Sequence, residues 1–209
     1  MPRALITGAA RGLGRELARQ YAADGWEVIG TERKDMDMTN RAQIREFARR
    51  LGGKPIDLLF CNAGISGKRG MAVGSFDFDS WEEVLRVNLL GPAALVEALV
   101  DNVAASERRT IALMSSRLGS ISESSGMTLP YSTSKAALNM LAKALAATLA
   151  GRGIIVVALS PGWVRTDMGG AGAPLSAEQS VQGLRRVIAG LKASDSGRFL
   201  SHDGTEIPW

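Results

Sequence analysis

The chain has 209 residues, of which 45% are hydrophobic and 5% aromatic, and its formal net charge is +4. Its scattered basic residues argue against nucleic acid binding, and its lysine-broken apolar runs exclude a membrane span. One cysteine excludes an intramolecular disulfide and, with a single histidine, argues against a zinc site, so we predict no metal. The low cysteine content and a start without a signal-peptide pattern predict a cytoplasmic protein.

Short apolar runs alternate with amphipathic stretches from one end of the chain to the other. The predicted strands cover 3–7, 27–32, 56–61, 110–115, 154–160 and 197–201. The predicted helices between them cover 12–24, 40–51, 80–104, 130–150 and 176–191. This alternation is typical of βαβ units in a parallel sheet, so we predict one α/β domain over residues 1–209.

Two of the predicted helices carry start signals. Asp79 or Ser80 precedes the third helix, and Ser176, with Gln179 three residues later, forms a capping-box pattern before the last one. Predicted loops follow strands or precede helices, where an open α/β sheet builds its site. They cover 64–75, 119–128 and 169–174.

The first predicted strand runs directly into a glycine-rich turn, TGAARGLGRELA, which contains Gly8, Gly12 and Gly14. Glycine tolerates positive φ and lets a backbone approach a ligand closely, and the helix that follows offers free N–H groups to a pyrophosphate. The GxxxGxG spacing departs from the standard GxGxxG dinucleotide fingerprint. By itself, the turn therefore fits either a phosphate site or a plain tight turn between strand and helix.

Small and acidic residues follow two further strands. The segment FCNAG places Asn62, Ala63 and Gly64 at the end of the third strand, where a ligand ring could pass over the strand end. The segment MDMTN places Asp37 shortly after the second strand. Taken singly, each segment could be an ordinary turn.

A protein with one histidine needs another proton donor near neutral pH, and the segment YSTSK offers Tyr131 and Lys135 four residues apart. A free tyrosine has a pKa of about 10. A nearby ammonium favours the phenolate, and positions i and i+4 share one helix face, so Lys135 can lower the pKa of Tyr131. Tyr131 would then serve as a general acid or base. Without other motifs, the pair would more simply be a half-buried tyrosine and a snorkelling lysine.

Three further polar residues are candidates for the same site. Ser115 and Ser116 end the strand before the Tyr131 helix, and a serine hydroxyl can hydrogen-bond a substrate carbonyl and the charge that grows on it. If Ser115 continues the strand, alternation directs the two side chains to opposite sides. Asn88 lies in an otherwise apolar helix, where it could instead satisfy a backbone carbonyl as the helix bends near the Gly-Pro pair that follows.

Together, these motifs resemble the short-chain dehydrogenase/reductase family in order and spacing, over almost the whole chain. The matching segments are TGxxxGxG at Thr7–Gly14, NAG at Asn62–Gly64, the helix asparagine Asn88, the serine Ser116, YxxxK at Tyr131–Lys135 and PGxVxT at Pro161–Thr166. Ser116 is chosen over Ser115 because the family's serine precedes xxG, as Ser116 precedes Arg-Leu-Gly here. The short chain and its ending GRFLSHDGTEIPW are most similar to the C-factor-like and Sniffer-type carbonyl reductase branch.

The resemblance implies a single-domain Rossmann fold, a doubly wound and mostly parallel sheet with helices on both faces. It also implies a catalytic tetrad in which Tyr131 is the acid or base, Lys135 tunes it and touches the nicotinamide ribose, Ser116 polarises the substrate oxygen and Asn88 holds a relay water. The residues implied to contact the cofactor are Gly8, Arg11, Gly12, Leu13, Gly14, Glu32, Arg33, Asp37, Met38, Asn62, Ala63, Gly64, Tyr131, Lys135, Pro161, Gly162, Val164 and Thr166.

The end of the second strand, GTERKD, bears on the choice between NAD and NADP. A carboxylate at Glu32 would bond the adenosine 2′-hydroxyl and repel a 2′-phosphate, whereas Arg33 and Arg11 could pair with that phosphate. By resemblance, Glu32 falls at the acid position of NAD enzymes, and the two arginines fall where NADP enzymes carry basic residues. We predict NAD, with NADP as the alternative.

The predicted reaction passes hydride between NAD(P)(H) and a small-molecule carbonyl or secondary alcohol. Family members commonly pair through long helices, here 80–104 and 130–150, which implies a homodimer or homotetramer. An alternative is a dinucleotide-binding signalling or sensor protein with incidental turnover, although a pure sensor needs the glycines and Glu32 but not the tetrad. A related epimerase or dehydratase would usually carry a larger substrate domain, for which this chain has no room.

Overall fold

A parallel sheet forms the centre of the computed structural model, which describes residues 1–68 and 70–209. Its strands are β1 (Arg3–Thr7), β2 (Glu27–Thr31), β3 (Leu58–Cys61), β4 (Thr110–Met114), β5 (Ile155–Ser160) and β6 (Phe199–Ser201). They lie in the order β2-β1-β3-β4-β5-β6, and each neighbouring pair is parallel. The six predicted strands are confirmed, although most are slightly shorter than the apolar runs that predicted them.

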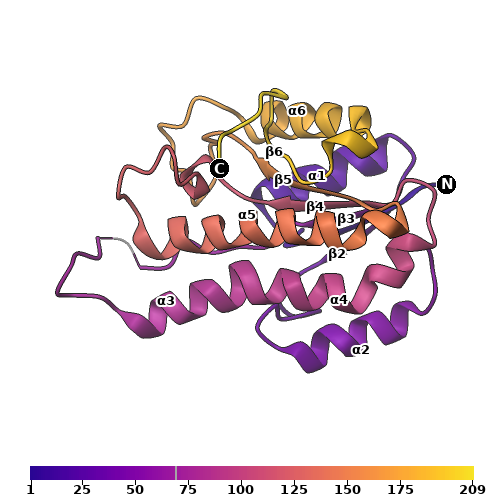
Figure 1. Cartoon of the computed structure of the whole chain (residues 1–209), viewed down its shortest axis with the longest axis horizontal. Helices are drawn as coiled ribbons and strands as arrows, with labels where there is room; N and C mark the ends of the chain where they lie inside the picture. Colours follow the sequence, from indigo (N-terminus) through magenta and orange to yellow (C-terminus); the bar gives the residue numbers. More distant parts are fainter. Residues whose placement is uncertain (69) are drawn as a thin grey trace.

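Helices cover both faces of this sheet, as the sequence predicts (Figure 1). They are α1 (Gly12–Ala23), α2 (Arg41–Leu51), α3 (Phe78–Leu85), α4 (Gly91–Ala104), α5 (Leu129–Leu149) and α6 (Ala177–Gly190). Figure 1 shows α1 and α6 on one side of the sheet and α2, α4 and α5 on the other. These alternating crossovers make the doubly wound arrangement of a Rossmann fold.

The strands are apolar at nearly every position because both faces of the sheet are buried. Side chains alternate along a strand, so Leu5 and Leu59 pack with α2, α4 and α5, whereas Ile6 and Phe60 pack with α1 and α6. Truncating one such buried side chain to alanine costs about 2–5 kcal/mol. This double core holds the strand ends, and hence the loops attached to them, in fixed positions.

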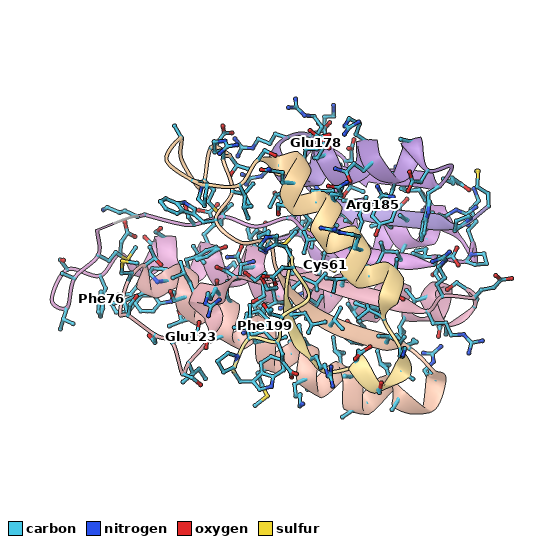
Figure 2. The ribbon with its side chains drawn as sticks, turned by 90° about the horizontal axis from the view of Figure 1, so that it is seen from above. Cys61, Phe76, Glu123, Glu178, Arg185 and Phe199 are labelled. Carbon is cyan, nitrogen blue, oxygen red and sulfur yellow. The ribbon has the colours of Figure 1, made fainter. Side chains whose placement is uncertain are left out.

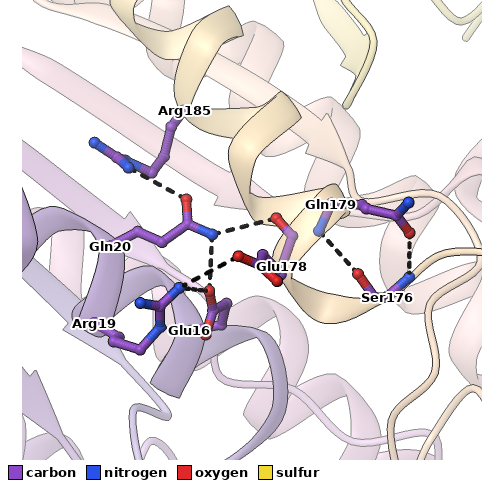
Figure 3. A network of polar contacts seen from close by, with 7 residues as sticks. All are labelled: Glu16, Arg19, Gln20, Ser176, Glu178, Gln179 and Arg185. Carbon is purple, nitrogen blue, oxygen red and sulfur yellow. Dashed lines mark hydrogen bonds and ion pairs between the residues drawn. The ribbon is translucent and has the colours of Figure 1, made fainter.

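Polar contacts as well as apolar ones join α1 to α6 (Figure 3). Gln20 donates to the Glu178 carbonyl at 3.2 Å and accepts from Arg185 at 3.2 Å. The predicted capping box is confirmed at the start of α6, where Ser176 and Gln179 exchange hydrogen bonds of 3.0 and 3.1 Å. The start of α6, and with it the loop that leads there from β5, is therefore held against α1.

The helix predicted at 80–104 starts earlier than expected. It begins at Phe78, and Asp77 caps it by accepting a hydrogen bond of 3.0 Å from the Ser80 N–H, so the prediction of Asp79 or Ser80 as the cap was wrong. The carboxylate that accepts from a backbone N–H three residues later is a standard cap geometry. Asp79 lies instead in the first turn of the helix.

The same helix also contains a π-helical turn, Arg86–Leu90, which joins α3 to α4. The turn lies directly before Gly91, where a Cβ atom would be only 2.7 Å from the Met38 carbonyl oxygen. Glycine at this position lets the helix pass close to the segment after β2. Asn88 lies within the π-helical turn and is fully buried, so this turn is where the long helix meets the candidate site.

The carboxyl ends of the strands lie at one edge of the sheet and carry the predicted loops. β1 pairs with both β2 and β3, so the strand order reverses at β1, and such switch points are where open α/β sheets bind ligands. Figure 2 shows Phe76 and Glu123, which lie in the loops after β3 and β4, at the same end of the molecule. In the described part of the chain, no helix is long and apolar enough to cross a bilayer.

Candidate active site

The glycine turn after β1 is packed too closely for larger residues. A Cβ atom at Gly14 would lie 2.1 Å from the Gly8 carbonyl oxygen and 2.5 Å from Asn62 Nδ2. Gly8 and Gly12 have φ angles of +70° and +54°, which L side chains rarely adopt. The three predicted glycines therefore shape one compact turn and bring its backbone against the NAG segment.

Thr7, to which the sequence assigned no role beyond its place in the motif, joins this turn to the NAG segment. Its Oγ1 accepts from the backbone N–H groups of Asn62 and Ala63, both at 3.0 Å. Asn62 Nδ2 donates in return to the Thr7 carbonyl at 2.9 Å. The signal for Thr7 was its position as the last residue of β1, next to a neighbouring strand end.

The amino-terminal end of α1 is suited to an anion. Arg11 precedes the helix in extended conformation without a side-chain capping bond, and the first turn holds no acidic residue. Leu13 turns its side chain into the core between α1 and the sheet. Uncapped N–H groups and the positive end of the helix dipole fit the pyrophosphate of a dinucleotide, so the residues present match the predicted cofactor.

The loop after β5 closes over this turn. A Cβ atom at Gly12 would lie 3.6 Å from Thr166 Cγ2, and Thr166 Oγ1 accepts from the Gly169 N–H at 3.2 Å. Arg11, predicted to contact a 2′-phosphate, pairs instead with Asp167 at 3.0 Å. Both side chains of this ion pair are largely exposed, so the pair is weak and can exchange for another partner.

Tyr131 and Lys135 lie in the first turns of α5, as predicted, and Lys135 is deeply buried. Its side chain passes towards the end of β4, where Nζ donates to the Met114 carbonyl at 2.7 Å. Nζ lies 5.5 Å from the centre of the Tyr131 ring. A Cβ atom at Gly64 would be 3.5 Å from this ammonium and 3.2 Å from Asn88 Oδ1. Three sequence-distant motifs therefore meet at Lys135.

Burial disfavours the charged forms of both groups. Desolvation lowers the pKa of Lys135 to about 8. Desolvation raises the pKa of Tyr131, and hydrogen bonding with Ser116 opposes that shift. The prediction that Lys135 lowers the pKa of Tyr131 was wrong, because burial raises that pKa and the effect that opposes the rise comes from Ser116. At neutral pH, Tyr131 is protonated and Lys135 is mostly charged, which is the state that a general acid for carbonyl reduction requires.

The two serines after β4 have different partners. Ser115 is buried, and its Oγ donates to Asn139 Oδ1 at 2.6 Å. Ser116 Oγ accepts from the Leu118 N–H at 3.2 Å, and hydrogen bonding with Ser116 has a lowering effect on the pKa of Tyr131. Ser116, the serine chosen by resemblance, is thus the one placed beside Tyr131, and Ser115 belongs to the interior.

Asn88 does satisfy a backbone carbonyl, but that carbonyl belongs to Ile65 after β3 and not to the helix bend that the alternative described. Its Oδ1 accepts from the Ile65 N–H at 2.9 Å, and its Nδ2 donates to the Ile65 carbonyl at 2.9 Å and to Ser134 Oγ at 3.0 Å. Ser134 in turn donates to the Tyr131 carbonyl at 2.7 Å. The Asn88 side chain therefore fixes the segment after β3 to the first turn of α5. The sequence assigned no role to Ser134, although it lies within YSTSK.

The segment after β2 lies at the far end of the predicted cofactor site. Glu32 pairs with Lys34 at 3.2 Å, and Arg33 pairs with Asp37 at 3.1 Å. Hydrogen bonding from the Thr39 N–H lowers the pKa of Asp37. Met38, one of the residues implied to contact the cofactor, has its side chain mostly buried in the core beside α4. The carboxylate predicted to favour NAD, Glu32, and the guanidinium predicted to favour NADP, Arg33, are thus both present. Each already forms an ion pair with a neighbouring side chain.

The PGWV segment turns sharply at the end of β5. Gly162 has a φ of +77°, and a Cβ atom there would lie 2.7 Å from Leu175. The Pro161 carbonyl accepts from Ser180 Oγ at 2.7 Å, and Val164 forms a bridge with Leu175. These contacts fix the turn to the start of α6, on the side of the site where the nicotinamide was predicted.

The loop between Ser116 and Tyr131 is held by residues near the end of the chain. Ser120 Oγ donates to the Pro208 carbonyl at 2.6 Å, and the Ser122 N–H donates to the Trp209 carbonyl at 3.0 Å. Trp209 stacks on Phe199 with ring centres 5.6 Å apart. The sequence gives no signal for these contacts, because they join segments that are far apart along the chain.

Comparison with known proteins identifies relatives that are similar in sequence to most of the chain. The family model described as short chain dehydrogenase matches residues 2–46 and 34–174. C-signal of Myxococcus xanthus is 40% identical over 167 residues, which cover 79% of this chain and 100% of that protein.

Solved structures share the fold over the whole chain. The NADPH-bound carbonyl reductase from chicken fatty liver is 28% identical with a TM-score of 0.91, covering 100% of this chain and 99% of that one. The carbonyl reductase Sniffer of D. melanogaster is 27% identical with a TM-score of 0.88, covering 100% of both chains. The chain therefore belongs to the short-chain dehydrogenase/reductase family of oxidoreductases, on the side of C-signal and the Sniffer-type carbonyl reductases.

Proposed function

We propose that the protein passes hydride between a nicotinamide dinucleotide and the carbonyl or secondary alcohol of a small molecule. The observation that carries this proposal is the buried Lys135 ammonium, which lies 5.5 Å from the Tyr131 ring centre. Hydrogen bonding with Ser116 opposes the rise that burial causes in the pKa of Tyr131. The uncapped glycine turn at α1 fits the pyrophosphate. The bound nicotinamide would supply the hydride in reduction and accept it in oxidation.

Each side chain then has a defined task in carbonyl reduction. Ser116 donates a hydrogen bond to the substrate oxygen and stabilises the negative charge that grows there. Tyr131 transfers its hydroxyl proton to that oxygen, which completes the alcohol. The Lys135 ammonium stabilises the phenolate that remains, because opposite charges attract strongly in a buried site. Asn88 holds the surrounding backbone and serves the relay that returns a proton to Tyr131. In oxidation, the same transfers run in reverse.

A carbonyl panel tests this function directly. The protein is incubated separately with NADH and NADPH and a broad set of aldehydes and ketones, and both cofactor oxidation and alcohol formation are measured. We expect at least one carbonyl to yield alcohol in an amount equal to the cofactor oxidised. Tight cofactor binding without alcohol from any member of the panel would overturn the enzymatic proposal.

We further propose that NAD is the preferred cofactor. Glu32 directly follows β2 and places a carboxylate where it would repel a 2′-phosphate, while Arg11 and Arg33 already pair with Asp167 and Asp37. The chicken carbonyl reductase, which is 28% identical, was solved with NADPH. For Arg11 or Arg33 to pair with a 2′-phosphate here, the arginine would have to exchange its present carboxylate partner.

Replacing Glu32 with serine is expected to tighten NADPH binding at least tenfold and to leave NADH binding unchanged or weaker, because the repulsion of the 2′-phosphate is removed. Dissociation constants from fluorescence titration of both reduced cofactors measure this effect. Glu46→Ser removes an ion-paired carboxylate on α2 and serves as the control that alters neither constant. Wild-type protein that binds NADPH at least tenfold more tightly than NADH would contradict the preference.

A second candidate function is that of a dinucleotide-binding signalling protein with incidental turnover. The 40% identity to C-signal of Myxococcus xanthus favours it. The glycine turn and Glu32 serve such a protein, but the contacts around Lys135 would then have no chemical task. The carbonyl panel separates the two functions, because a sensor would bind cofactor and form no alcohol.

We also propose that copies of the chain pair through α4 and α5. A groove of about 440 Å³ lies between these helices and is lined mainly by apolar residues, including Leu90, Ala94, Leu141 and Leu145. Leu145→Glu would place a charge in this groove, which is costly if a partner buries it.

By size-exclusion chromatography with light scattering, we expect a wild-type dimer or tetramer and a monomeric Leu145→Glu variant. Val73→Glu, at an exposed loop position, should keep the assembly; a wild-type monomer would contradict the proposal.

A further inference from the structure

Asn139 is a buried amide on α5, one turn beyond Lys135, and both ends of its side chain are bonded. Its Oδ1 accepts from Ser115 Oγ at 2.6 Å, and its Nδ2 donates to the Gly119 carbonyl at 3.1 Å. The residue is 3% exposed. Its two partners belong to a different segment, the one that follows β4.

These two bonds bracket Ser116. Ser115 precedes it directly, and Gly119 follows it by three residues at the end of the 3₁₀ turn Arg117–Gly119. Gly119 is pressed against the same helix, because a Cβ atom there would lie 2.8 Å from the Lys135 backbone carbon. The short segment that carries Ser116 is therefore attached to α5 on both sides of the serine.

We propose that Asn139 is a positioning residue, which sets the place of the Ser116 hydroxyl relative to Tyr131. This inference rests on the proposed function of the site. Tyr131, Lys135 and Asn139 share α5, so the Asn139 bonds fix the serine segment in the frame of the acid and its lysine. An amide of this length offers an acceptor to the Ser115 hydroxyl and a donor to the Gly119 carbonyl at once.

Asn139→Asp keeps the size of the side chain and removes the donor to the Gly119 carbonyl. A displacement of about 1 Å at a reacting group can cost about 100-fold in rate. We expect kcat, normalised to the number of cofactor-binding sites, to fall by about 10- to 100-fold. The dissociation constant of the cofactor and the KM for the carbonyl should change little, because neither depends mainly on Ser116.

A double-mutant cycle with Ser116→Ala isolates the positioning role. If Asn139 acts through Ser116, Asn139→Asp lowers kcat strongly in the wild type and only slightly when Ser116 is already alanine. An equal loss of kcat in both backgrounds, or no loss in the wild type, would overturn the proposal. Ser116→Ala must itself lower turnover. If it does not, the proposed role of Ser116 fails first, and the role of Asn139 falls with it.

Two further variants separate positioning from folding. Asn102→Asp alters another buried amide, which lies on α4 and donates to the Gly52 and Lys54 carbonyls. It should lower the melting temperature but leave kcat per bound cofactor unchanged. If Asn139→Asp does not fold, Ser115→Ala removes one of the two bracketing bonds and should show the same dependence on Ser116. A folded Ser115→Ala variant with full kcat, and a folded Asn139→Asp variant with full kcat, would together contradict the proposal that these bonds position Ser116.

Discussion

Tyr131→Phe is expected to lower turnover by about 10²–10⁴-fold, the usual contribution of a positioned general acid or base. The substitution removes the hydroxyl that delivers the proton in the proposed mechanism and keeps the ring next to the Lys135 ammonium. Cofactor affinity should therefore remain close to that of the wild type. Steady-state kinetics on a carbonyl identified from the panel and fluorescence titration with the reduced cofactor measure the two effects.

Tyr21→Phe is the matched control, because Tyr21 is the other tyrosine of the chain. It is buried on α1 with the Arg185 guanidinium 4.8 Å from its ring centre, away from α5. Its removal should alter stability but not turnover. If Tyr131→Phe retained wild-type turnover while Tyr21→Phe behaved as expected, the assignment of Tyr131 as the acid would be wrong.

Gly14→Ala is expected to weaken binding of the reduced cofactor by about 10- to 100-fold. The added Cβ atom would lie 2.1 Å from the Gly8 carbonyl oxygen, so the backbone of the phosphate turn has to move. Losing one hydrogen bond to a charged group costs about 1.5–3 kcal/mol, which corresponds to this range of affinity. Titration of cofactor fluorescence measures the change.

Gly190→Ala controls for the general effect of adding a methyl group. A Cβ atom at Gly190, the last residue of α6, would meet no heavy atom within 4 Å. This variant should bind cofactor as the wild type does. A folded Gly14→Ala variant with unchanged cofactor affinity would show that the pyrophosphate does not bind at this turn.

The fold was predictable from the sequence because strands and helices differ in the spacing of their apolar residues and in the residues that flank them. Strands such as IIVVALS are apolar at nearly every position, which is typical of a sheet buried on both faces. The start of α6 was also predictable, since Ser176 and Gln179 form a local capping motif. The π-helical turn Arg86–Leu90 was not, because it depends on a tertiary contact between Gly91 and the Met38 backbone.

Site residues were predictable where they form a short motif with a fixed spacing along the chain. The glycines and the Tyr131–Lys135 pair are of this kind. Residues that act through partners far along the chain were missed: Thr7 bonds the NAG segment, and Asn139 bonds the segment around Ser116. The ion pair of Arg11 with Asp167 was missed for the same reason. The effect of burial on Tyr131 was also missed, because desolvation depends on the packed structure.

The pH dependence of carbonyl reduction tests the Tyr131–Lys135 pair most directly. In the proposed mechanism Tyr131 needs a charged Lys135, and desolvation lowers the pKa of that lysine to about 8. Because the ammonium exists below this pKa and is lost above it, kcat/KM should be level at neutral pH and fall as the pH rises through about 8. Lys135→Arg, which keeps its charge to higher pH, should move the fall upward. A fall that stays at the same pH in an active Lys135→Arg variant, or a wild-type profile without a fall, would contradict this mechanism.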